Sequence, residues 1–382
     1  MKIVFPYFGQ LHQVLHSLPI AAAMAMRHRD VEVHVAAAKP AHLEFIRRML
    51  LEHAPDAPLH IDALRMPWLR GFRIKRRTMI KNRRYLRSFD AIVVPERTSL
   101  FMRHLGLGRT QLIWTRHGAG DRAIGFASDV GQFDFVLVAG AKIEQRLLAA
   151  GLIRTGHYAS GIYAKFDWMR KLQSERRFFD NDRPTILYNP HFATGLSSWD
   201  PHGFKVLEFF AASEQYNLIF APHVRLFEPR DAKKERAFER YACLPHLHID
   251  LGSERSIDMS YVQAADLYLG DVSSQVSEFL VRPRPCLFIN SHRVGWQGNP
   301  DDLFWALGPV NEDLDGLAAN LEGAFSRHAD FAAAQLKYVE ETFGSQKGEC
   351  SGARAADAIV QFIGDLEPKA DQPNTLSLRS RQ

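Results

Sequence analysis

Apolar runs of strand length alternate with amphipathic segments of helix length along most of the chain. The alternation starts at residue 2 and starts again at residue 185. Strands that alternate with helices in this way favour a parallel sheet with helices on both faces. We therefore predict an α/β protein with two parallel-sheet domains. The predicted strands are 2–6, 31–36, 91–95, 111–114, 133–139, 185–190, 217–220, 247–251 and 285–289, with a further one at the end of 264–269.

A polar, charged run separates the two predicted domains. The run at 173–184 interrupts the alternation of strands and helices. We therefore place an N-terminal domain at 1–172, a linker at 173–184 and a C-terminal domain at 185–366. The polar tail at 367–382 is predicted to be disordered, as chain ends without apolar anchors commonly are.

The composition is that of an ordinary globular protein. The chain has 382 residues, of which 46% are hydrophobic and 24% charged, which is enough to build sizeable cores. Its three cysteines, Cys243, Cys286 and Cys350, are far apart and lack metal-ligand spacing. They argue for a reducing compartment and against both a disulfide framework and a structural zinc site. The N-terminal apolar run is too short for a signal peptide and no later run approaches the length of a membrane span, so we expect a cytoplasmic protein.

The positive charge is concentrated in one segment. The net charge is +5, yet 65–87 alone has ten basic residues and no acidic one, with aromatic and aliphatic residues between them. A helix of this kind after Pro67 suits the headgroups of an anionic membrane, here the inner face of the cell membrane, or a polyanionic substrate. A solvated basic helix over part of the core explains the segment equally well. No nucleic-acid-binding motif accompanies the charge, so we expect no nucleic-acid partner.

Candidate functional residues follow the strands of the first domain. Ligands of open α/β sheets bind at the carboxyl ends of the strands. Gly9, Gln10 and His12 follow the first strand and are candidates for an acceptor site, although a plain strand-to-helix turn also explains them. His117 and Gly118 follow a later strand. Histidine titrates near neutral pH and glycine lets a ligand approach the backbone, so His117 is a candidate base; a hydrogen-bonded structural histidine is the alternative.

The second domain has candidates at equivalent places. Asn189 lies at the end of the strand 185–190, and His223 and Arg225 follow the strand 217–220. Because both of the latter side chains can be cationic donors, they could neutralise a diphosphate. These loops and those of the first domain are expected to face one cleft.

The sequence Gly270-Asp271-Val272-Ser273-Ser274 lies where a strand passes into a helix. The hydroxyls of Ser273 and Ser274 and the first free amides of the helix together favour a phosphate or pyrophosphate. Glu278, one turn into that helix, is within reach of a ribose hydroxyl. The alternative is that Ser273 only caps the helix and Glu278 is only a solvated helix residue.

Several of these motifs resemble those of the CDP-glycerol glycerophosphotransferase family, which makes teichoic-acid-like and capsular glycerol-phosphate chains. The motifs are His117-Gly118, Pro222-His223, Asp271-Val272-Ser273-Ser274 with Glu278-Phe279, the strand end at 186–190 and the segment 160–167. The resemblance covers about residues 105 to 300 and implies a GT-B fold, with two Rossmann-like domains facing across a cleft. Val224, Val272 and Glu278 depart from the family pattern, which usually has Pro, Tyr and Asp there, so the donor stays open.

The resemblance implies the transfer of a glycerol-phosphate or other polyol-phosphate group from a CDP-activated donor to a hydroxyl of a cell-envelope glycan or lipid-linked acceptor. It implies catalytic roles for His117 and His223. Implied substrate contacts are Gly9, Gln10, Gly118, Asn189, Arg225, Asp271, Ser273, Ser274 and Glu278. No metal or other cofactor is predicted, because protein donors would neutralise the diphosphate. The alternatives are a GT-B glycosyltransferase that uses a nucleotide sugar, a nucleotide-sugar 2-epimerase-like enzyme and a non-catalytic binding module.

Overall fold

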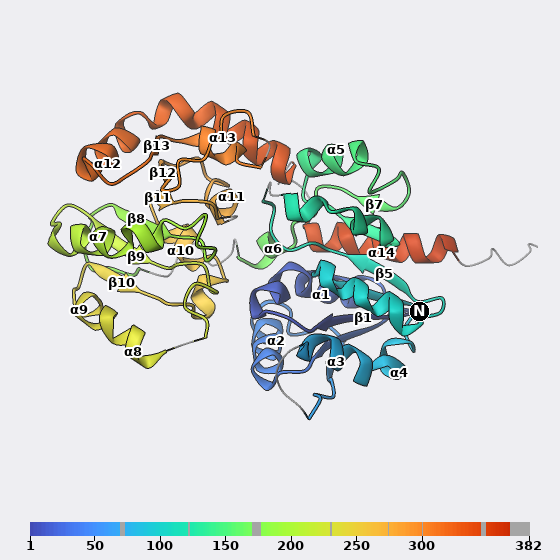
Figure 1. Cartoon of the computed structure of the whole chain (residues 1–382). Coiled ribbons are helices and arrows are strands. Elements are labelled where there is room, and N and C mark those ends of the chain that lie inside the picture. Colours follow the sequence, from blue (N-terminus) through green and yellow to red (C-terminus); the bar gives the residue numbers. More distant parts are fainter. Residues whose placement is uncertain are drawn as a thin grey trace, which may run out of the picture.

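Two parallel β-sheets organise the chain, as the alternation of strands and helices predicts (Figure 1). The computed structural model describes residues 1–68, 73–120, 123–169, 177–229, 231–273, 275–299, 301–344 and 349–366. The first sheet has seven strands in the order β3-β2-β1-β4-β5-β6-β7, and the second has six in the order β10-β9-β8-β11-β12-β13. Both orders reverse beside their first strand, which is the Rossmann arrangement. The predicted fold of two Rossmann-like domains is confirmed.

The strands lie close to their predicted positions, with short edge strands added. The first sheet consists of β1 (Lys2–Tyr7), β2 (Glu32–Ala37), β3 (His60–Ala63), β4 (Ala91–Val94), β5 (Gln111–Trp114), β6 (Phe135–Leu137) and β7 (Tyr158–Ala159). The second consists of β8 (Thr185–Asn189), β9 (Asn217–Phe220), β10 (Leu247–Ile249), β11 (Leu267–Gly270), β12 (Cys286–Ile289) and β13 (Val310–Asn311). The sequence pattern misses β3, β7 and β13, which lie at sheet edges and lack the apolar runs of the central strands.

Helices cover both faces of the sheets. The longer ones are α1 (Leu18–Arg27), α2 (Pro40–His53), α3 (Ile74–Lys81), α5 (Ala141–Ala149), α7 (Trp199–Ala212), α12 (Leu317–Ser326), α13 (His328–Phe343) and α14 (Ser351–Leu366). Short ones are α4 (Arg83–Leu86), α6 (Lys165–Met169), α8 (Ala232–Glu235), α9 (Glu239–Ala242), α10 (Ser260–Ala264) and α11 (Gln275–Phe279). The 3₁₀ helices are η1 (Leu11–His16), η2 (Arg97–Leu105), η3 (Ala123–Phe126), η4 (Ser128–Gln132), η6 (Arg236–Phe238), η7 (Glu254–Ser256) and η8 (Leu303–Leu307). Among the described residues, no helix combines the length and apolarity needed to cross a bilayer.

The last helix returns to the first domain. In Figure 1, α14 lies across the half that contains β1 to β7. The carboxylate of Asp167 accepts hydrogen bonds from the first amides of α14, and Phe362 packs against Phe135 of β6 with ring centroids 4.7 Å apart. The predicted domain at 185–366 therefore differs from the structure at its end, because the apolar face of α14 is buried on the first sheet. The linker at 173–184 stays a prediction, since 170–176 lie outside the described residues, as does the tail at 367–382.

The basic segment at 65–87 is divided between the inside and the outside of the first domain. Met79 and Leu86 are fully buried, whereas Trp68 is 93% exposed. The predicted helix is interrupted at Asn82, whose side chain bonds to the backbone of Arg65 and of Thr78. Met79 and Leu86 thus anchor the described part of the segment, whereas Trp68 lies in solvent. Residues 69–72 lie outside the described part.

Candidate functional site

The loop after β5 contains the candidate base. Arg116 and Gly118, on either side of His117, have positive φ angles of 58° and 79°, a conformation that glycine adopts easily and arginine rarely does. The imidazole Nδ1 of His117 lies 2.7 Å from the carbonyl oxygen of Pro95 at the end of β4. A carbonyl can only accept a hydrogen bond, so Nδ1 carries the proton and Nε2 of a neutral ring has a free lone pair.

His117 is solvent-accessible but surrounded by protein. The residue is exposed, yet burial lowers its pKa, and the charges of Arg116 and Lys75 lower it further against the opposing effect of the bond to Pro95. An accessible ring that is nevertheless partly desolvated is typical of a cleft. The ring is therefore neutral at pH 7, as a general base must be.

Two further histidines lie beside His117. Both come from η1, the 3₁₀ helix that follows β1. The ring centroids of His12 and His16 are 5.7 Å and 6.5 Å from that of His117. Burial lowers the pKa of each well below 6.5, and electrostatic interactions with Lys165 and the neighbouring histidines lower it further. The first domain thus contributes three neutral imidazoles to one place.

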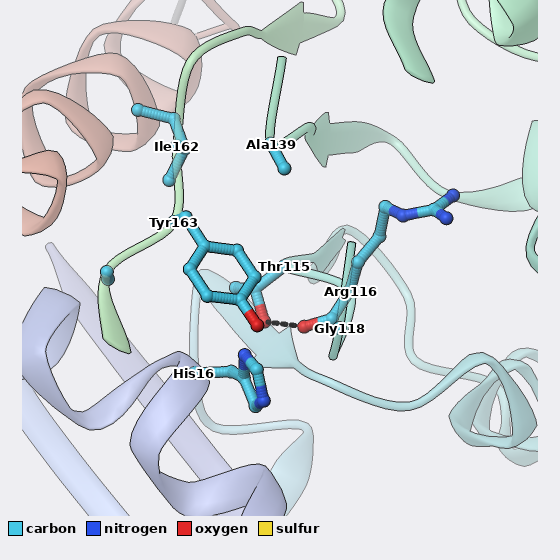
Figure 2. A pocket seen from close by; sticks show the side chains of 8 residues that line it. His16, Thr115, Arg116, Gly118, Ala139, Ile162 and Tyr163 are labelled. Atoms are coloured by element: carbon cyan, nitrogen blue, oxygen red, sulfur yellow. Dashed lines mark hydrogen bonds between the residues drawn. The ribbon is translucent and has the colours of Figure 1, made fainter. Parts of the chain in front are cut away.

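A small pocket adjoins this cluster (Figure 2). Figure 2 shows the rings of His16 and Tyr163 next to each other, and the side chain of Arg116 directed away from them. The centroids of His16 and Tyr163 are 5.4 Å apart. The guanidinium of Arg116 instead donates to the carbonyl of Gly125 and lies over the ring of Trp114. Arg116 therefore fixes the loop, and Gly118, which lines the pocket, borders the space beside the histidines.

The loop after β9 in the second domain contains His223 and Arg225. The backbone N–H of Arg225 donates to Nδ1 of His223 at 3.1 Å, so the proton of that neutral ring is on Nε2. Burial, with the charges of His191 and Arg225, lowers the pKa of His223 to about 3. The guanidinium of Arg225 is exposed and lies 4.0 Å from the ring centroid of Phe192. His223 is thus a neutral hydrogen-bond donor beside a permanent cation.

Electrostatic coupling shows that the two sets of loops lie near each other. Burial is the main cause that lowers the pKa of His12, and electrostatic interactions with the His117 and His223 rings, Lys165 and Arg225 lower it further. His12 and His117 belong to the first domain, whereas His223 and Arg225 belong to the second. The candidates of both domains therefore lie within electrostatic range of His12, and their convergence on one cleft stays a prediction.

Gly9 and Gln10 lie at the same edge of the first sheet. A Cβ atom on Gly9 would collide with the carboxylate of Glu96, which pairs with Lys75 of α3. The ends of the Glu96 and Gln13 side chains thus pack directly against the backbone of Gly9. Gln10 precedes η1 and takes part in its capping box with Gln13. Gly9 and Gln10 are partly exposed, and both have a structural task in the loop.

Asp271 and Asn189 do not face the cleft. Both are fully buried. The Asp271 carboxylate accepts hydrogen bonds from the backbone amides of His191, Ser198 and Val272 and from the Ser198 hydroxyl. The Asn189 amide donates to the carbonyl of Ala221. The resemblance implies that Asp271 and Asn189 contact the substrate, and the structure corrects this. Both side chains instead join the loops that follow β8, β9 and β11.

Glu278 is also used inside the protein. Its carboxylate accepts a 2.6 Å hydrogen bond from the hydroxyl of Tyr163 and two 2.8 Å bonds from the ammonium of Lys165. The side chains of Glu278 and Lys165 are each only 7% exposed. Because Tyr163 and Lys165 come from the first domain and Glu278 from α11 of the second, the group is a buried link between the two. The ribose contact implied for Glu278 is not available in this arrangement.

Ser273 lies two residues before the start of α11 and binds the first amide of that helix. Its hydroxyl oxygen accepts a 3.3 Å hydrogen bond from the amide of Gln275, and the residue is 2% exposed. The hydroxyl can still donate, so a phosphate contact for Ser273 stays a prediction. Ser274 lies outside the described residues.

The sequence gives only weak signals for the other residues of this site. His16 shares η1 with His12, but a spacing of four residues has no special meaning for chemistry. Lys165 lies in the segment 160–167 that carries part of the family resemblance, yet nothing in the sequence pairs it with Glu278. Glu96 follows β4 directly and could have been found by the strand-end rule applied to the other candidates.

Comparison with known proteins supports the fold. No protein-family model matches the chain, and no curated sequence does. The UDP-GlcNAc 2-epimerase from Neisseria meningitidis bound to UDP-GlcNAc is 11% identical with a TM-score of 0.61, covering 96% of this chain and all of that one. A putative UDP-N-acetylglucosamine 2-epimerase from Listeria monocytogenes is 14% identical with a TM-score of 0.66, over 97% and 98% of the two chains. The wall teichoic acid polymerase TagF is 13% identical with a TM-score of 0.62, over 95% and 89%. At these identities the likeness establishes the GT-B fold alone.

Proposed function

We propose that this GT-B protein is a transferase that moves a glycerol-phosphate or other polyol-phosphate group from a CDP-activated donor to a hydroxyl of a cell-envelope glycan or lipid-linked acceptor. One observation carries the proposal. His117 and His223 come from opposite domains, and their backbone hydrogen bonds give them opposite tautomers. One ring can accept a proton while the other can donate a hydrogen bond, which is the division of labour that acid–base catalysis of group transfer requires.

The reaction would use these two rings as follows. Nε2 of His117 takes the proton of the acceptor hydroxyl, whose oxygen forms a bond to the β-phosphorus of the donor. The bond from that phosphorus to the bridging oxygen breaks, and CMP leaves with the bonding electron pair. Nε2–H of His223 and the guanidinium of Arg225 stabilise the negative charge on the diphosphate. Gly118 leaves room beside His117 for the reacting group.

The likeness to TagF supports a CDP-linked donor, because a variant of that protein was soaked with CDPG. The likeness to UDP-GlcNAc 2-epimerases supports a nucleotide-sugar donor to the same degree. Glu96 favours this second candidate. Its buried carboxylate lies next to Gly9, and Glu96 follows Pro95, whose carbonyl oxygen accepts the hydrogen bond from His117. A 2-epimerase-like enzyme would use such a carboxylate in proton transfer at a sugar carbon.

The basic segment supports a peripheral position at the inner face of the cell membrane, where a lipid-linked acceptor would be found. Trp68 and Ile80 are exposed and border one open pocket together with Pro67, Arg77 and Lys81. An aromatic ring beside cationic side chains suits the headgroup layer of an anionic bilayer. Lys75 is turned inward to Glu96 and would not take part.

Sedimentation with vesicles tests the membrane contact. The Trp68→Ala and Arg77→Ala variants should each bind phosphatidylglycerol vesicles less than the unmodified protein does, whereas Leu336→Ala, which removes an exposed leucine from α13, should not change binding. Equal sedimentation of all four proteins would contradict a membrane role for this surface.

A ligand screen followed by product analysis tests the transferase. CDP-glycerol should raise the melting temperature more than CDP-ribitol, UDP-GlcNAc or GDP-sugars do, because a ligand at 100 times its Kd stabilises the folded state by about 2.7 kcal/mol. Incubation with CDP-glycerol and a polyol-phosphate primer should then release CMP. Stabilisation by UDP-GlcNAc with formation of its 2-epimer would replace the transferase with the epimerase-like candidate. Binding of a donor without any product would leave only a binding module.

A further inference from the structure

Four side chains with ligand atoms form a group on β2 and β3, at the far edge of the first sheet. Glu32 and His34 lie two residues apart on β2, and His60 and Asp62 lie two residues apart on β3. Residues two apart in a strand point to the same face. The parallel register pairs His34 with His60, so all four side chains lie on one face of two adjacent strands.

Three of these residues bring their ligand atoms together. One ligand atom from each of Glu32, His34 and His60 lies within 4.8 Å of the others. Oε1 of Glu32 is 2.9 Å from Nε2 of His34, and the rings of His34 and His60 are stacked with centroids 4.5 Å apart. Two imidazoles and a carboxylate at this separation match the ligand set that Zn²⁺ prefers.

The remaining contacts hold His34 in the orientation that a metal ligand needs. Nδ1 of His34 is 2.6 Å from the carboxylate of Asp62, which also accepts a 2.5 Å hydrogen bond from the hydroxyl of Tyr85. The ring of Phe89 packs edge-on against His34 at 4.9 Å. A carboxylate that fixes the second nitrogen of a histidine is the usual support of a zinc-binding imidazole.

Both carboxylate oxygens of Glu32 have a partner in the structure, and Oε1 is the one on the side of His34. Its Oε2 pairs with Lys2 at 2.8 Å, while Oε1 faces His34. An ion bound at Oε1 would therefore replace the hydrogen bond between Glu32 and His34 and leave the ion pair with Lys2 in place.

We propose that Glu32, His34 and His60 bind a transition-metal ion, Zn²⁺ in the first place, with water in the fourth position. The proton that His34 shares with Glu32 leaves to solvent when the ion enters, and Asp62 acts as a positioning residue through Nδ1. The site joins the edge strand β3 to β2 near the amino ends of both strands, away from the carboxyl-end loops of the cleft. The ion thus has a structural task that is separate from the proposed transferase chemistry.

The widely spaced cysteines argue against a structural zinc site, and this cluster contains none of them. Its signal in the sequence is the pair Glu32-x-His34 and His60-x-Asp62, which becomes visible only when β3 is known to be a strand. Because β3 is short and half-exposed, a metal ion that links it to β2 would stabilise the weakest edge of the sheet.

The test uses the full chain without an affinity tag, freed of metal with EDTA and titrated with ZnCl₂ by calorimetry. One site should be seen, with release of a proton and a rise in melting temperature. Co²⁺ in its place should give the visible absorption of a tetrahedral site. His60→Ala should weaken Zn²⁺ binding at least 10-fold, and Asp62→Asn should weaken it about 10-fold.

Two control variants exclude other histidines. His104→Ala removes an exposed histidine of η2 and should leave Zn²⁺ affinity unchanged, as should His117→Ala in the cleft. Since His60 is exposed, its removal should not alter the melting temperature of the metal-free protein. Failure to bind Zn²⁺, or binding that His60→Ala leaves intact, would overturn the proposal.

Discussion

The two sheets reverse their strand order at equivalent places, yet the loops there have different tasks. At the reversal between β8 and β11, Asp271 is buried and bonded to three backbone amides. One strand beyond the reversal between β1 and β4, in the loop after β5, His117 makes one hydrogen bond through Nδ1 and is accessible to solvent. The carboxyl edge of the second sheet is therefore closed by internal hydrogen bonds at Asp271, and we call it the closed edge. The carboxyl edge of the first sheet is accessible at His117, and we call it the open edge.

The difference shows what decides whether a polar residue at a strand end can act on a ligand. Asp271, Asn189 and Glu278 have their polar atoms bonded within the protein, and all are at most 7% exposed. His117 and Arg225 keep donor or acceptor capacity and are exposed. Burial, rather than position at a strand end, separates residues that hold the loops from residues that can bind or react.

The most severe test of this comparison is removal of the accessible base. His117→Ala should lower the rate of CMP release about 10²- to 10⁴-fold, because general base catalysis contributes about that much. Donor binding, measured as the thermal shift with CDP-glycerol, should be nearly unchanged, since the diphosphate contacts are proposed to lie in the other domain. His104→Ala is the matched control. Turnover within threefold of the unmodified protein would remove His117 from the mechanism.

The buried link between the domains gives the next largest effect. Glu278→Leu leaves the Lys165 ammonium buried and unpaired, which should lower the free energy of unfolding by about 3 kcal/mol. Replacing both residues, as Lys165→Met with Glu278→Leu, should restore most of that loss. Glu254→Gln is the matched control, because Glu254 also pairs across the domains, with Arg48, but both side chains are more than 40% exposed. It should cost less than about 1 kcal/mol.

Urea denaturation of the four proteins measures these differences. If Glu278→Leu keeps normal stability but weakens the binding of CDP-glycerol, the ribose contact implied by the family resemblance would be correct and the ion pair a minor feature.

The fold follows from the sequence more completely than the site does. Central strands such as β1 and β5 are continuous apolar runs, so their places and their parallel arrangement follow from the pattern alone. Strand-end rules also single out His117 and His223, which the structure places in loops of different domains that both act electrostatically on His12. The pairing of Glu278 with Lys165 joins residues 113 positions apart, and no local pattern encodes such a contact. The return of α14 to the first domain is equally invisible, because an amphipathic helix does not specify which sheet it covers.

The hydrogen bonds that Asp271 accepts at the closed edge can be tested by removing its carboxylate. Asp271→Ala removes the acceptor of the amides of His191 and Ser198 and should lower the free energy of unfolding by about 2 kcal/mol, the cost of leaving buried donors unpaired. Backbone amides of 191–198 should then exchange with deuterium faster than in the unmodified protein. Asp313→Ala, at an exposed loop position, should change stability by less than about 0.5 kcal/mol. Unchanged exchange at 191–198 would mean that Asp271 does not hold this loop.

Acidification should lower the stability of the folded protein, because several histidines near the open edge resist protonation. Burial lowers the pKa of His12, His16 and His223 below the value of 6.5 that they have when unfolded. Below pH 6.5 the unfolded chain therefore binds protons that the folded chain does not, and stability falls as the pH drops. Asp271 acts in the opposite sense, because burial raises its pKa to about 6. It is protonated more readily when folded, which offsets part of the loss between pH 6 and 4.

The net result should be a loss of stability from pH 6.5 to 5, because three histidines oppose protonation in the folded state and Asp271 alone offsets part of their effect. Melting temperatures at constant ionic strength measure it. His223→Gln removes one of the titrating rings and should make the decline shallower, whereas Asp271→Ala removes the offset and should make it steeper between pH 6 and 5. The melting temperatures of the unmodified protein, His223→Gln and Asp271→Ala could all stay constant from pH 7 to 5. That result would show that these histidines are protonated with no loss of stability, and that the open edge is far more hydrated than its geometry indicates.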